Sequence, residues 1–83
     1  MAAALLADIT EIFRYVLRDP GIELTSATRF DELSEWDSMY LIDVVVEIES
    51  RFDLLFETDE IETLHTTGDL LRMLAHKRAL AAA

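Results

Sequence analysis

Apolar residues recur at the three- and four-residue spacing of an amphipathic helix in separate stretches of the chain. Over residues 4–18 the apolar positions are Leu5, Ile9, Ile12, Phe13, Val16 and Leu17. We expect Asp19-Pro20-Gly21 to end this helix, because proline lacks a backbone donor and glycine permits a reversing turn. The chain has 83 residues and no cysteine. A single small domain over residues 1–83 must therefore gain its stability from helix packing.

A second helix is predicted from Ser38 to about Arg51. Its expected core stripe consists of Leu41, Ile42, Val45, Ile48 and Phe52. Asp43 and Glu47 lie one turn apart and should face outward. The triplet Val44-Val45-Val46 is also compatible with a buried strand, but the flanking charges keep a helical period and favour the helix.

The connection between these helices, residues 21–36, shows no sustained period. Its apolar residues are expected to pin the loop against the helices; they are Ile22, Leu24, Phe30, Leu33 and Trp36. A loop of this length inside a small domain needs such anchors or a function.

Two more helices are predicted after the second helix. Thr58-Asp59-Glu60-Ile61 opens a short third helix, whose acids complement the helix dipole. A last helix follows, and Thr66 and Asp69 at its start have capping-box-like spacing. Its inward residues should be Leu70, Leu71, Leu74 and Leu80. The sequence thus predicts an all-α fold, an irregular four-helix bundle with three longer helices, one short third helix and a long loop between the first two.

The charge of the chain is concentrated in its middle. Of its 17 Asp and Glu residues, 13 lie between Asp31 and Asp69, beside a single basic residue, Arg51. Such a surface repels nucleic-acid phosphates and anionic membranes, whereas it can steer basic protein partners or simply keep the domain in solution. The chain is 52% hydrophobic, and it has neither a long apolar run nor a basic leader segment. We expect an ordered monomer in the cytoplasm, bound to neither nucleic acid nor membrane.

Ser38 stands where the loop gives way to the second helix. Asp37 before it is a good N-cap, which would leave Ser38 in the first turn and close to solvent. Taken alone, Asp-Ser is most simply a cap. A nucleophilic serine would need an adjacent base, but His65 and His76 are not placed for a triad and no Gly-x-Ser-x-Gly motif is present. We therefore expect no catalytic residue, and an exposed serine that another enzyme modifies.

Acidic side chains also cluster before and within the short third helix: Asp53, Glu57, Asp59, Glu60 and Glu62. They lack the Asp-x-Asp-x-Asp-Gly layout of an EF-hand loop. No dedicated metal site is expected.

Asp37-Ser38-Met39, the run through Ile48-Glu49 and the pair Phe52-Asp53 resemble the acyl/peptidyl carrier protein family over roughly residues 5–76. The resemblance implies a helical bundle with 4′-phosphopantetheine attached covalently to Ser38, transferred from coenzyme A by a phosphopantetheinyl transferase. The distal thiol of that arm would hold an acyl or aminoacyl group as a thioester.

The same resemblance implies protein partners. They are the transferase, an acyl- or aminoacyl-loading ligase, and a downstream synthase or transferase. These partners would dock beside Ser38 on the second helix, where we expect Asp37, Met39, Tyr40, Asp43 and Glu47 to bind them.

The chain departs from primary fatty-acid carriers at four positions. Met39 replaces the usual leucine, Tyr40 and Ser50 stand where acids are common, and Trp36 is bulkier than the usual loop residue. These differences favour a stand-alone carrier of a specialised acyl, polyketide or aminoacyl pathway, such as the D-alanyl carriers. The alternatives are a primary fatty-acid synthesis carrier and an unmodified acidic helical module that binds other proteins.

Overall fold

A computed structural model describes residues 2–34 and 36–82, with the side chains of residues 4–34 and 36–79. The α-helices in these ranges are α1 (Ala2–Leu17), α2 (Ser38–Phe52), α3 (Thr58–Ile61) and α4 (Thr67–Ala82). The predicted all-α fold, with its short third helix, is confirmed. One turn of 3₁₀ helix, η1 (Phe30–Glu32), lies within the first connection and was not predicted. No helix in the described ranges is long and apolar enough to cross a membrane.

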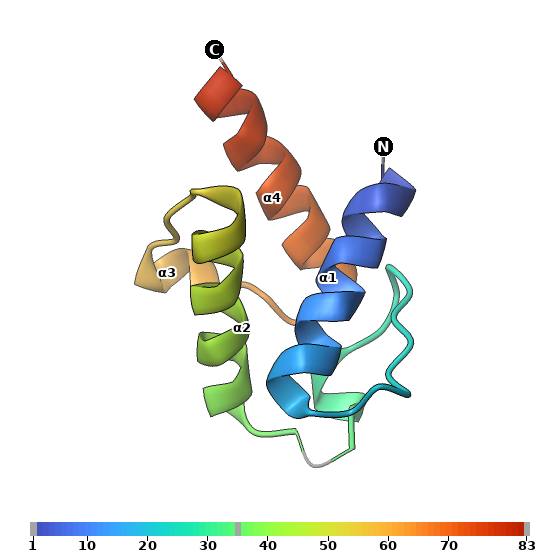
Figure 1. Ribbon diagram of the computed structural model, residues 1–83. Coiled ribbons are helices and arrows are strands. Elements are labelled where there is room, and N and C mark those ends of the chain that lie inside the picture. Colours follow the sequence, from blue (N-terminus) through green and yellow to red (C-terminus); the bar gives the residue numbers. More distant parts are fainter. Residues whose placement is uncertain (1, 35, 83) are drawn as a thin grey trace.

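Helix α1 packs against both α2 and α4, while α3 is seen across α2 from α1 (Figure 1). Both ends of the chain lie in the upper part of the molecule in this view, and α2 begins at the lower end. The start of α2 is thus remote from both termini.

The core is made of aliphatic side chains and three aromatic rings, those of Phe13, Phe30 and Phe56. Ile9, Ile12 and Phe13 of α1 are fully buried, as are Leu70 and Leu74 of α4. The long first loop is pinned to this core, as predicted. Its buried anchors are Ile22, Leu24 and Phe30, and its partly buried ones are Leu33 and Trp36.

Helix α2 is rotated relative to the predicted stripe. Val44, Val45 and Ile48 are buried, with Leu41 and Phe52 packed against them. The prediction that Ile42 is core was wrong, because its side chain is 42% exposed. Apolar residues occur on two faces of this helix, so periodicity alone did not distinguish the buried face.

Left-handed residues, rather than glycine, end the first two helices. Helix α1 stops at Leu17 and Arg18 has φ 55°; α2 stops at Phe52 and Asp53 has φ 55°. The predicted reversing turn follows at residues 19–22, where the Ile22 N–H donates to the Asp19 carbonyl at 3.4 Å, although neither glycine has a positive φ. In α4, Leu70 and Leu74 are buried and Leu71 is partly buried, whereas the side chain of Leu80 lies outside the described ones.

The register of α2 can be tested with the same substitution on its two faces. Ile48→Ala should cost about 2–5 kcal/mol of unfolding free energy, because it opens a cavity in the core. Ile42→Ala should cost under about 1 kcal/mol, since much of that side chain is already in water. Urea denaturation of the two variants measures the difference, and equal losses would contradict the observed rotation of α2.

Candidate functional site

The candidate site lies at the first turn of α2. Asp37 adopts an extended conformation, and its carboxylate accepts a hydrogen bond from the backbone N–H of Met39 at 2.9 Å. The N–H of Tyr40 donates to the Asp37 carbonyl, also at 2.9 Å. Asp37 thus caps α2 as predicted, and Ser38 is its first residue, with an exposed side chain. The serine hydroxyl is held on a rigid element and open to solvent.

Aromatic packing fixes the segment that leads to this turn. The indole of Trp36 is stacked on Phe13 with centroids 6.1 Å apart, and it lies 5.6 Å from the Phe30 ring. Tyr40 packs against the same indole at 6.1 Å and is half-buried. Trp36 therefore anchors the chain to α1 one residue before the cap.

A hollow of about 380 Å³ opens beside Ser38. Its wall on α2 is formed by Met39 and Ile42, and the opposite wall by Ile61 and Leu64. Arg29 and His65, which sequence reasoning did not connect with this site, also line it. No local signal marks these two residues, because only long-range pairing brings them here.

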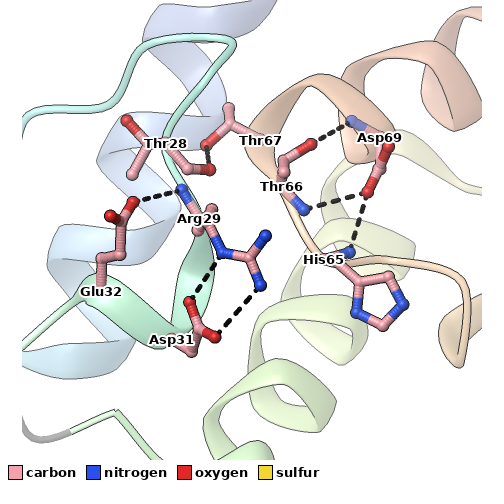
Figure 2. Close-up of polar contacts among 8 residues, drawn as sticks. All are labelled: Thr28, Arg29, Asp31, Glu32, His65, Thr66, Thr67 and Asp69. Atoms are coloured by element: carbon pink, nitrogen blue, oxygen red, sulfur yellow. Dashed lines mark hydrogen bonds and ion pairs between the residues drawn. The ribbon is translucent and has the colours of Figure 1, made fainter.

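Backbone hydrogen bonds hold the first loop against the start of α4. The Thr67 hydroxyl also donates to the Thr28 carbonyl oxygen at 3.4 Å (Figure 2). Arg29 and Thr66 form an isolated antiparallel bridge, and the Thr67 N–H donates to the Thr28 carbonyl at 2.9 Å. The Gly68 N–H donates to the Ser26 carbonyl at 2.8 Å, and a Cβ at Gly68 would meet that same oxygen at 2.8 Å. The loop can approach this closely only because residue 68 has no side chain.

The predicted cap of α4 is present at the same place (Figure 2). The Asp69 carboxylate accepts hydrogen bonds from the backbone N–H groups of His65 and Thr66, both at 3.0 Å, and the Asp69 N–H donates to Thr66 Oγ1 at 3.1 Å. The bond from His65, together with those from Thr66, holds the pKa of Asp69 below its ordinary value. The wall that carries His65 is thereby locked to α4.

One ion pair lines the hollow, and a second pair joins α3 to α4. The Arg29 guanidinium bonds to Asp31 at 3.3 Å, which raises the pKa of Arg29 (Figure 2). At the far side of α3, Lys77 Nζ donates to Glu60 Oε1 at 2.7 Å and lies 5.2 Å from the centroid of the Phe56 ring. Only 15% of the Lys77 side chain is exposed, so this pair fastens α3 to α4.

The residues expected to bind partners lie on different flanks of α2. Met39 faces the hollow beside Ser38, whereas Asp43 and Glu47 line a second hollow toward α1. Glu47 is partly buried and accepts a hydrogen bond from Arg51 Nε at 3.1 Å. Tyr40 is drawn inward by Trp36, and the Asp37 carboxylate is engaged in the cap. The five residues therefore do not form one uniform surface.

Among the described side chains, those of residues 4–34 and 36–79, no hydrogen bond joins Ser38 to a histidine or a carboxylate. His65 lines the same hollow, yet its described hydrogen bond is the one from its backbone N–H to Asp69, and no bond joins it to the serine. In the same ranges, no group of three or more His, Asp or Glu side chains is placed to hold a metal ion.

Three comparisons bear on this site. A family model described as a phosphopantetheine attachment site matches residues 7–74. An acyl carrier protein of Streptococcus pyogenes is 36% identical over 74 residues, covering 89% of this chain and 96% of the relative. One from Acidothermus cellulolyticus is 28% identical over 72 residues, covering 87% and 86%.

Solved structures of acyl carrier proteins have the same fold. A holo acyl carrier protein from Geobacter metallireducens has a TM-score of 0.84 and 31% identity, covering 93% of this chain and 88% of its own. One from Thermotoga maritima has a TM-score of 0.87 and 26% identity, covering 96% and 93%.

The roles of Asp37 and Ser38 in the fold can be separated by substitution. Asp37→Ala should cost roughly 0.5–2 kcal/mol of unfolding free energy, because it removes the N-cap. Ser38→Ala should cost less than about 0.5 kcal/mol, since alanine is a good helix former and the cap remains. Thermal unfolding followed by circular dichroism measures both losses. A larger loss for Ser38→Ala would mean that the serine is primarily structural.

The Lys77–Glu60 pair makes a pH-dependent prediction. The hydrogen bond from Lys77, with one from the Glu57 backbone, lowers the pKa of Glu60 below its ordinary 4.5. A lowered folded-state pKa stabilises the protein above the ordinary value, and that contribution is lost as the pH falls through the folded pKa. Lys77→Gln should therefore reduce stability at neutral pH and make the loss on acidification less steep.

Arg51→Gln is the matched control, because it breaks a more exposed ion pair with Glu47. Urea denaturation of the wild type and both variants, repeated at several pH values between neutral and acid, gives the slope of the unfolding free energy against pH for each protein. Identical slopes for wild type and Lys77→Gln would contradict the coupling of Glu60 to Lys77.

Proposed function

The chain belongs to the phosphopantetheine-attachment family of acyl carrier proteins, and on that premise we propose that Ser38 receives the 4′-phosphopantetheine arm. Proteins of this family carry acyl groups and are not catalysts. The covalently attached group, when present, supplies a distal thiol that holds the acyl group as a thioester. This chain, which has no cysteine, contains no thiol of its own.

The exposed hydroxyl at the first turn of α2 is the observation that supports Ser38. Asp37 and Trp36 hold this turn in place from the cap and from the core, so the backbone that carries the hydroxyl has a defined position. The turn lies at the end of the molecule remote from the termini, where a modifying enzyme can approach (Figure 1). No internal base is required, because the phosphopantetheinyl transferase would activate the hydroxyl. The serine oxygen would form a phosphodiester with the phosphopantetheine phosphate as the pyrophosphate bond of coenzyme A breaks and adenosine 3′,5′-bisphosphate leaves.

Ser26, Ser34 and Ser50 are also exposed, but none begins a helix. Ser26 and Ser34 lie in the first connection, and Ser50 lies near the end of α2. None of the three therefore lies in a capped first turn of a helix, as Ser38 does.

Partner enzymes would dock along α2 from this point. The surface offered to the transferase, a loading ligase and a downstream synthase includes Asp37, Met39, Tyr40, Asp43 and Glu47. We further propose that the chain serves as a carrier in a specialised acyl, polyketide or aminoacyl pathway in the cytoplasm. Tyr40 and Ser50 support that pathway, since acids are common at both positions in primary fatty-acid carriers and neither residue is charged here.

Modification of Ser38 is tested by mass spectrometry. Incubation with a phosphopantetheinyl transferase and coenzyme A should add the mass of one phosphopantetheine group to the wild type, and Ser38→Ala should abolish the addition. Ser50→Ala is the matched control on the same helix and should be modified at the wild-type level. Modification that persists in the Ser38→Ala protein would disprove the assignment.

A further inference from the structure

Helix α2 exposes an apolar stripe that begins beside Ser38. Met39, Ile42 and Val46 are 64%, 42% and 57% exposed. Their spacing of three and four residues places them along one side of the helix. We call these three residues the α2 stripe. Exposed apolar residues are ordinary when isolated, but a row next to a site of modification indicates a surface that another protein covers.

The acids of α2 contribute less to this surface than the net charge of −10 suggests. Glu47 is paired with Arg51 at 3.1 Å, and the Glu49 carboxylate accepts a hydrogen bond from the Phe56 N–H at 2.8 Å. Asp43 is the acid that remains exposed within the span of the stripe. Much of the acidity of the helix is thus engaged in holding the fold.

The apolar surface continues onto α1. Val46 and Tyr15 line a shallow hollow of about 360 Å³ between the two helices, and Tyr15 is 65% exposed. The Arg51 guanidinium lies 5.7 Å from the centroid of the Tyr15 ring, which helps to position the ring. Arg18, Asp43 and Glu47 line the same hollow, and Glu47 is the acid already paired with Arg51. Val46 and Tyr15 therefore extend the apolar area toward α1, while charged side chains line the rest of the hollow.

We propose that enzymes acting on Ser38 bind the α2 stripe and Tyr15 in an apolar groove, and that burial of these side chains rather than charge attraction supplies the affinity. This inference rests on the proposed function of Ser38. The partner it requires is an enzyme whose surface beside its active-site entrance is an aliphatic or aromatic groove. A dense basic patch on the partner would meet few unpaired acids on this face. Such a contact is insensitive to salt, whereas an electrostatic one is screened.

A phosphopantetheinyl transferase with coenzyme A is the probe, because it must dock beside Ser38 to modify it. Val46→Thr keeps the shape of the side chain and makes it polar. Ile42→Gln places a polar side chain of similar size, though of different shape, at the middle of the stripe. Each should raise the KM for the carrier about fivefold or more, with kcat little changed. Leu55→Gln is the matched control, since Leu55 is 80% exposed but lies outside the helix, and it should leave KM unchanged within about twofold.

The salt dependence of KM and the effect of Asp43→Asn on KM distinguish apolar from electrostatic docking. The KM of the wild type should change less than about threefold between about 0.05 and 0.5 M salt, and Asp43→Asn should cost less than Val46→Thr. A KM that rises steeply with salt, or an Asp43→Asn effect that exceeds those of the stripe variants, would overturn the inference. Equal effects of Leu55→Gln and the stripe variants would also overturn it.

The two proposals fail in different ways. If the wild type is modified at Ser38 but the stripe variants behave as wild type, only the docking surface is wrong. If mass spectrometry shows no modification of the wild type, both proposals are wrong. Far-ultraviolet circular dichroism of every variant verifies that α2 is intact.

Discussion

The stacking of Trp36 on Phe13, with Phe30 beside both rings, positions the start of α2 relative to α1. The connection between the two helices has little regular structure of its own, so its path depends on side chains buried in the core. Phe30 is 2% exposed and its N–H donates to the His65 carbonyl at 3.0 Å. The same residue thus joins the aromatic cluster to the chain that enters α4. Loss of this packing would release the cap at Asp37 and the serine that follows it.

Close backbone contact between the first loop and the start of α4 creates the second part of the site. The approach at Gly68 brings Arg29 and His65 to the hollow beside Ser38, although the two are far apart in sequence. The reciprocal cap of Thr66 and Asp69 stiffens this wall, and the Lys77–Glu60 pair secures the short α3. Polar interactions therefore define the surroundings of the serine, whereas apolar burial supplies most of the stability.

The acidic composition also has a structural use. Asp37, Glu49, Glu60 and Asp69 all accept hydrogen bonds from backbone N–H groups, and several acids form ion pairs. These carboxylates accept hydrogen bonds from backbone N–H groups in the connections and at helix ends, where no backbone carbonyl of a sheet or a long helix serves as the acceptor. A large net charge consequently does not give a uniformly acidic surface around Ser38. On α2, the side chains left exposed beside Ser38 are largely apolar.

Much of the fold could be read from the sequence, because each helix carries a local signal. The spacing of Ile9, Ile12 and Phe13 predicted α1, the Asp37 cap predicted where α2 begins, and Thr66 with Asp69 marked the start of α4. The loop anchors were also identified correctly. The face that α2 buries was not, since Ile42 and Val44 are similarly apolar and only packing in the core selects Val44.

The sequence by itself determined the helix positions, the four-helix class and the family motif around Ser38, since these depend on residues close together along the chain. Only the tertiary structure decided which apolar residues are buried, which acids are engaged internally, and which distant residues border the serine. Those outcomes depend on the packing of helices and on contacts such as Gly68 with Ser26, and local spacing carries no information about either.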